Sequence, residues 1–162
     1  MSLILNGTDG ITFPNSTEQA SAGSVLQVVN FSVHTTVSSS TSTYVDSGIT
    51  ATITPKFSTS KILIIVDATG LYKATNNAAI GLKLVRNSTD LLVFEALAGY
   101  TNTTTSNGVG GSGVSYLDSP TTTSATIYKV QFASLTNNAT VYVNQNYTGV
   151  GNSTITLMEI AA

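Results

Sequence analysis

The sequence predicts an all-β protein: an antiparallel β-sandwich of about eight or nine strands, with a jelly roll as the leading topology. Three observations support this prediction. Val, Ile and Thr, which favour strands, are abundant, and the 7 Tyr and 5 Phe side chains are spread along the chain. Strand-like segments recur at a spacing of roughly 8 to 15 residues between clusters of Gly, Asn, Ser and Thr. No stretch shows the 3.6-residue apolar period of a helix.

Residues 1–23 are expected to form an N-terminal arm ahead of a sandwich domain at residues 24–162. Short apolar pieces alternate in the arm with the turn dipeptides Asn6-Gly7 and Asp9-Gly10. Because pieces this short cannot bury their own side chains, we expect an extended arm that docks on its own domain or on a neighbouring subunit. Its apolar residues are the candidate docking residues: Leu3, Ile4, Leu5, Ile11 and Phe13.

The first strands of the body are expected at 25–37, 44–54 and 61–71. In the second, Ile49, Ala51 and Ile53 alternate with Thr, so one face is apolar and the other carries hydroxyl groups, and Pro55 ends the run. The third contains the continuous apolar run Ile62–Val66, which is typical of a strand covered on both faces. We therefore expect 61–71 to be a central strand.

The second half of the body begins with two strands at 79–86 and 91–97, joined as a hairpin by a four-residue turn, Asn87–Asp90. Residues 101–113 have almost no apolar content and are expected to be an exposed loop. Strands follow at 114–117, 125–135, 140–147 and 154–160, and in the second of these Tyr128, Val130 and Phe132 share a face. The candidate residues for outward contact lie in or beside the loop: Tyr100, Asn102, Asn107 and Tyr116.

Charge is scarce. Only 14 of the 162 residues are Lys, Arg, Asp or Glu (9%), against about 25% in ordinary domains, while Thr, Ser and Asn supply 27, 20 and 13 residues. A net charge of −2 and six scattered basic residues argue against nucleic-acid binding. The longest nearly unbroken apolar run, Ile62–Val66, is far shorter than the roughly 20 residues of a membrane span. The N-terminus has no secretory signal, so synthesis in a cytoplasm is expected.

The residues that usually carry chemistry are almost absent, so no catalytic residue, cofactor or metal site is predicted. The single histidine, His34, has no Gly-x-Ser-x-Gly motif beside it and is expected to be an exposed strand residue. One histidine does not make a metal site, and the Gly-rich stretch Gly108–Gly113 lacks the Lys-Ser or Lys-Thr of a P-loop. An enzyme would have to use carboxylates that meet only in the fold, with Asp67 and Glu95 as the candidates.

Seven segments spread along nearly the whole chain are distinctive: Leu3–Pro14, Gln19–Gly23, Tyr44–Gly48, Ser60–Leu63, Leu117–Pro120, Tyr128–Gln131 and Ile155–Ala161. In this order they resemble the virion structural proteins of tailed phages, especially the tail-fibre and related proteins of marine and cyanobacterial phages. None of these segments is catalytic.

The resemblance implies a non-enzymatic β-sandwich component of a virion, commonly a homotrimer. Because the chain has no long shaft, repeats, collagen-like stretch or coiled coil, a capsid decoration (cement) protein is the leading interpretation. Its partners would be further copies of itself and the major capsid protein or other virion proteins. Two alternatives stay open: a tail-fibre or receptor-binding tip that contacts host surface polysaccharide, and a free carbohydrate-binding module.

Overall fold

The computed structural model describes residues 4–6, 10–12, 18–19, 23–145 and 152–162. Every regular element in these residues is a β-strand, and none of them forms a helix that could span a membrane. Three short strands precede the sandwich: β1 (Ile4–Asn6), β2 (Gly10–Thr12) and β3 (Glu18–Gln19). The strands of the sandwich are β4 (Val25–Val33), β5 (Val37–Ser39), β6 (Val45–Ile53), β7 (Lys61–Lys73), β8 (Ala79–Arg86), β9 (Thr89–Ala98), β10 (Asn107–Asp118), β11 (Thr126–Thr136), β12 (Val141–Val143) and β13 (Ser153–Ile160).

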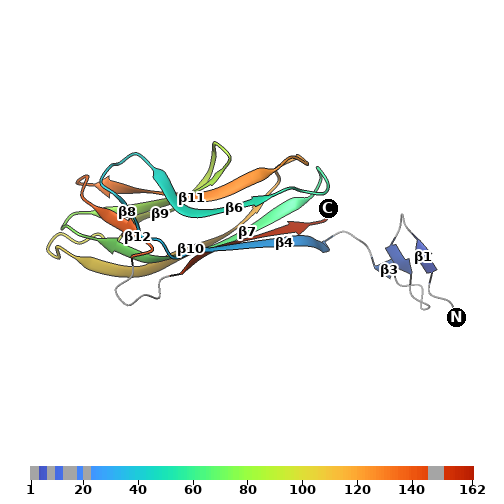
Figure 1. The fold of residues 1–162 in the computed structure, drawn as a ribbon, viewed down its shortest axis with the longest axis horizontal. Helices are drawn as coiled ribbons and strands as arrows, with labels where there is room; N and C mark the ends of the chain where they lie inside the picture. The colour runs from blue at the N-terminus through green and yellow to red at the C-terminus, as the bar shows by residue number, and fades with distance from the viewer. Residues whose placement is uncertain (1–3, 7–9, 13–17, 20–22, 146–151) are drawn as a thin grey trace.

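The sandwich consists of two antiparallel sheets packed face to face (Figure 1). The first sheet has the order β4-β13-β7-β10, with the short pair β12-β5 continuing it beside the far end of β7. The second sheet has the order β6-β11-β8-β9. The order of the eight main strands in the two sheets, β4-β13-β7-β10 and β6-β11-β8-β9, is that of a jelly roll. The predicted fold class is therefore confirmed.

Strand β7 is the centre of the first sheet, as predicted, but the expectation that both of its faces are covered is wrong, because only one face packs against the second sheet and Ile65 on the other is 38% exposed. It pairs along its length with β10 on one side, and with β13 and then β12 on the other. Its inward residues Ile62, Ile64 and Val66 are buried in the core between the sheets. The opposite face of the core comes from the second sheet, where Tyr128, Val130 and Phe132 of β11 are fully buried on one shared face, again as predicted.

In the part of the chain that the structure describes, the segments between the eight main strands, including the short strands β5 and β12, lie at one of two ends of the sandwich. Segments 34–44, 74–78, 99–106 and 137–145 lie at one end, which we call the loop end. Segments 54–60, 87–88 and 119–125 lie at the other, together with the start of β4 and the C-terminus (Figure 1). We call this the arm end, because the N-terminal strands join the sandwich there.

Three local expectations are wrong. The predicted loop 101–113 is a loop only up to Ser106, because Asn107–Gly113 belong to β10 and pair with β7. The turn between β8 and β9 has two residues instead of four, and Asn87 adopts the positive φ that such a turn requires (53°). The sequence does not predict β5 as a separate strand, because the three residues Val37–Ser39 are too few to show a periodic pattern.

The N-terminal arm is also less extended than expected. β1, β2 and β3 pair antiparallel into a small sheet of their own, which Figure 1 shows apart from the sandwich. Frequent turn residues allow the chain to reverse direction at such short intervals. Of the candidate docking residues, Ile4 and Leu5 lie in β1 and Ile11 lies in β2, whereas Leu3 and Phe13 lie outside the described residues.

Candidate interaction surfaces

The histidine and the two carboxylates that the sequence singles out lie in separate places. No group of three or more His, Cys, Asp or Glu residues in the described part of the chain could hold a metal ion. His34 is exposed immediately after β4, so its position agrees with the predicted exposure. The two carboxylates proposed for an enzyme are not brought together: Asp67 is exposed on the outer face of the first sheet, while Glu95 lies in β9 and accepts bonds from the backbone of Ala96 and Leu97.

Asp118, at the end of β10, holds the two sheets together at the arm end. Its carboxylate accepts two bonds from Arg86 Nη1, at 2.9 and 2.8 Å, and one of 2.6 Å from the hydroxyl of the fully buried Tyr128. Burial and the neighbouring Asp118 raise the pKa of Tyr128, so its hydroxyl stays a proton donor. The sequence motif Leu117–Pro120 contains this carboxylate, but sequence alone does not indicate its buried role.

Glu159 of β13 is the second buried carboxylate at the arm end. It accepts bonds from Gln27 Nε2 (2.5 Å) and from the backbone N–H groups of Lys56 (2.7 Å) and Phe57 (3.4 Å). Burial by itself would raise the pKa of Glu159, but these donors favour the charged form more strongly, so the pKa lies below the ordinary value of 4.5. The carboxylate thereby fixes the connection 54–60 against β4 and β13.

We expect Glu159 to make the protein acid-sensitive. A carboxyl whose pKa is lowered by folding stabilises the native state fully above its unfolded pKa, and this contribution is lost as pH falls through the lower folded value. Melting temperatures measured by circular dichroism between pH 7 and pH 3 should therefore fall below about pH 4.5. Glu159→Gln should be less stable at pH 7 and should fall less steeply below pH 4.5. Parallel curves for the two proteins would contradict this role.

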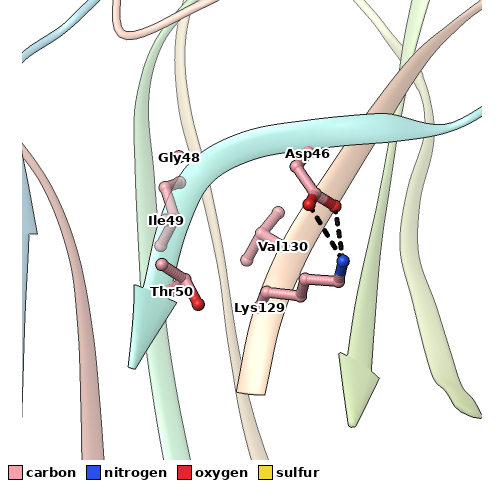
Figure 2. Close-up of a pocket in the computed structure, with 6 residues that line it drawn as sticks. All are labelled: Asp46, Gly48, Ile49, Thr50, Lys129 and Val130. Carbon is pink, nitrogen blue, oxygen red and sulfur yellow. Dashed lines mark hydrogen bonds and ion pairs between the residues drawn. The ribbon is translucent and has the colours of Figure 1, made fainter. Parts of the chain in front are cut away.

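The second sheet carries a shallow depression on its outer face, with a volume of about 160 Å³ (Figure 2). It lies over a bulge where Gly48 has a φ of 85° and the Ser47 hydroxyl bonds to the backbone of Val130. At the rim of the depression, the Asp46 carboxylate accepts hydrogen bonds from Lys129 Nζ (2.9 Å) and Gln131 Nε2 (2.7 Å). Partial burial would raise the pKa of Asp46, but these bonds outweigh it and lower the pKa. Because these charged groups already satisfy one another, the depression does not present a free group to a ligand.

The outer face of the first sheet carries an exposed apolar row near the arm end. The pairing register places Leu117 of β10, Leu63 of β7, Met158 of β13 and Val28 of β4 side by side on this face. Leu117 is 50% exposed and Val28 55%, and Ile65 continues the apolar surface along β7 at 38%. We call the four residues Leu117, Leu63, Met158 and Val28 the apolar stripe. A stripe across four strands is about 15 Å long, because neighbouring strands lie roughly 4.8 Å apart.

The long edge strands of the first sheet contain few charged residues, although β10 is bulged at Gly108–Gly111 and Lys56 Nζ donates to Leu26 O of β4. Edge strands are normally interrupted by lysine, proline or other charges. β4 has nine residues and no charge, and the only charged residue among the twelve of β10 is Asp118, which is buried. Neither strand contains proline. Long, uncharged edges of this kind are suited to coverage by a partner.

The predicted outward-contact residues do not form one cluster. Tyr100 and Asn102 are exposed at the loop end, and Asn107 pairs with Lys73 at the start of β10. Tyr116 instead pairs with Ile64 and packs against the core. Nine residues of β7 separate the two pairing positions, which corresponds to about 30 Å. Only Tyr100 and Asn102 thus share one exposed connection.

Comparisons with known proteins yield a likeness of backbone only. No family model matches the chain, and no curated protein matches it. Among solved structures, the chain is similar to the VP2 subviral particle of infectious bursal disease virus, with a TM-score of 0.47, 11% identity, and coverage of 91% of this chain and 40% of that chain. The chain is also similar to the structure of T=1 particles derived from that virus, with a TM-score of 0.46 and 11% identity. This match covers 100% of this chain and 41% of that chain. The chain spans about two fifths of the length of these structures.

Proposed function

We propose that this protein is a non-enzymatic structural component of a bacteriophage virion, and that it acts as a homotrimeric capsid decoration protein. The segments that resemble phage virion proteins support the class of protein. The observation that carries the docking role is the apolar stripe, a row of four apolar side chains across the first sheet, of which Leu117 and Val28 are exposed and Leu63 and Met158 half-buried. Exposed apolar area of this kind marks protein interfaces when it is continuous.

The position of the stripe relative to the arm supports attachment through the arm end. Gly23 donates a backbone bond of 2.7 Å to Ala161, and Ala161 donates one of 2.9 Å to Ser24. These bonds fix the point where the arm leaves the sandwich beside the end of β13, two residues beyond Met158 of the stripe. The arm and the stripe can therefore engage the same neighbouring surface, while the loop end points away from it.

The long edges with few charges favour self-association as the first step of assembly. A contact between β10 of one copy and β4 of the next would cover both edges, and such a head-to-tail contact closes into a ring when its rotation is 120°. A bound trimer would add interface area that exists only on the assembled lattice, and it would stabilise the lattice by mass action.

Native mass and surface substitutions test the trimer. By sedimentation at micromolar concentration, the wild type is expected at about 50 kDa, three times the monomer mass of 16.8 kDa. Val28→Asp combined with Leu117→Asp should give a folded monomer, because the two residues lie on the edge strands β4 and β10 and like charges are destabilising across a contact between strands. The matched control is Ile127→Asp, at a 42% exposed apolar residue on the second sheet, which should remain trimeric. A monomeric wild type, or equal dissociation of the control, would contradict the trimer interface.

Particles test the decoration role itself. Virions assembled without the protein should release DNA on heating at a lower temperature than complete virions, and added wild-type protein should restore the difference. Antibody labelling observed by electron microscopy should place the protein on the head. Labelling of the tail, with unchanged heat release, would instead favour the tail-fibre or receptor-binding alternative.

A further inference from the structure

Two tyrosines lie together on the outer face of the first sheet at the loop end. Tyr72 of β7 pairs with Tyr142 of β12, and both are half-buried. Their neighbours Leu71, Val141 and Val143 are buried in the core, so the alternation of the strands directs both tyrosine rings outward. The ring centres are 5.7 Å apart and the planes are tilted by 53°. The two rings form a small aromatic surface.

Among the described residues, the register neighbours of the two rings are small. The register places Gly108 of β10 next to Tyr72 and Ser38 of β5 next to Tyr142, and both are exposed. A Cβ atom built on Gly108 would have nothing within 4 Å. Gly108, Tyr72, Tyr142 and Ser38 therefore form a row across four strands. In this row the two aromatic rings lie between Gly108, which has no side chain, and the hydroxyl group of Ser38. We call this row the tyrosine platform.

The surroundings of the platform carry no free charge. The connections of the loop end, 34–44, 74–78, 99–106 and 137–145, contain no Lys, Arg, Asp or Glu. The nearest acidic residue on the outer face of β7 is Asp67, five residues along the strand, or about 16 Å. Lys73 is fully buried and donates to Thr101. Hydroxyl and amide groups of Ser, Thr and Asn make up most of this end.

We propose that the tyrosine platform binds a neutral glycan. The C–H groups of a pyranose ring carry partial positive charge and pack on the electron-rich face of an aromatic ring, while surrounding hydroxyl groups exchange hydrogen bonds with the sugar. The absence of charge disfavours an anionic polysaccharide, which needs basic partners. This site lies about 30 Å from the apolar stripe, since nine residues of β7 separate Leu63 from Tyr72. It does not depend on whether the protein sits on the head or the tail.

Affinity electrophoresis of the full-length protein tests the site. Native gels containing dextran, mannan or galactan supply the neutral probes, and a heparin gel supplies an anionic one. We expect one or more of the neutral polysaccharides to retard the wild type. Tyr142→Ala and Tyr72→Ala should each weaken this retention about threefold to tenfold, because an aromatic contact contributes roughly that factor. Tyr142→Phe keeps the ring and should keep most of the binding.

Two further variants separate loss of the site from loss of the fold. Gly108→Gln projects into open space and should weaken retention without lowering the melting temperature, because nothing there clashes. Tyr100→Ala, also at the loop end but off the platform, should bind like the wild type. Absence of retention by all three neutral polysaccharides, retention by heparin alone, or a loss confined to Tyr100→Ala would overturn the proposal. None of these results bears on the trimer, which is measured by mass.

Discussion

Gly70→Ala is expected to destabilise the sandwich by about 4 kcal/mol, which for a chain of this size lowers the melting temperature by roughly 10 °C. Gly70 has a φ of 59°, which costs an alanine about 1 kcal/mol. A Cβ atom there would also contact the carbonyl oxygen of Gln145, and would lie 2.7 Å from Gln145 N and 2.9 Å from the carbonyl carbon of Asn144. Because these are backbone atoms, they cannot move aside as a flexible side chain would.

The displaced segment holds a buried polar network, which explains the size of the effect. Asn144 is fully buried; it donates from its backbone to Thr69 O (3.0 Å) and from its side chain to Thr35 O (3.1 Å), and it accepts from the Ser153 hydroxyl. Moving it away from Gly70 would leave several of these groups without partners, and each unsatisfied buried group costs about 1 to 3 kcal/mol.

Two other glycines provide a matched series for thermal unfolding. Gly110 has a φ of 91° but open space around it, so Gly110→Ala should show the backbone cost alone, about 1 kcal/mol. Gly108 has neither a positive φ nor a neighbour within 4 Å, so Gly108→Ala should be neutral. Equal melting temperatures for the three variants would show that the contact of Gly70 with the end of β12 does not stabilise the fold.

Asp118→Ala is expected to cost about 3 to 5 kcal/mol, because it removes one partner of a buried ion pair and leaves the other uncompensated. The buried Tyr128 hydroxyl would lose its acceptor, and Arg86 would lose both of its bonds to the carboxylate. The free energy of unfolding in guanidinium chloride measures the loss. Asp118→Asn should recover part of it, since the amide oxygen still accepts one bond.

An exposed ion pair of similar length is the control. Lys83 contacts Asp90 at 2.8 Å, but Asp90 is 64% exposed, so Asp90→Ala should cost less than about 1 kcal/mol. If the two aspartate variants lost the same stability, the burial of Asp118 would not be the cause.

The sequence predicted most strands because their patterns are local. The apolar run of β7 and the alternation of β6 set the periodicity of each strand, and pleating alone then decides which residues share a face. For residues 107–113 of β10 the sequence predicts a loop, because glycine and serine have low strand propensity, whereas 114–117 are predicted as a strand. In the structure these residues pair with β7. A Cβ atom on Gly111 or Gly113 would lie 2.9 Å from a backbone carbonyl oxygen of β7. Small residues there permit a close approach that no local pattern reveals.

The candidate surfaces depend on relations that are not local. The apolar stripe joins Val28, Leu63, Leu117 and Met158, and the tyrosine platform joins Ser38, Tyr72, Gly108 and Tyr142. In the sequence each of these residues resembles an ordinary strand position. Tyr100 and Tyr116 appeared to flank one loop, but the strand between them separates them along the sheet.

The sequence by itself therefore determined that the chain is an all-β sandwich and where most strands lie, because composition and short-range periodicity carry that information. Only the tertiary structure decided which strands are neighbours, which apolar residues remain exposed and which tyrosines meet. Those outcomes depend on the pairing register between strands far apart in the chain, and a shift of one residue would turn every side chain of a strand to the opposite face.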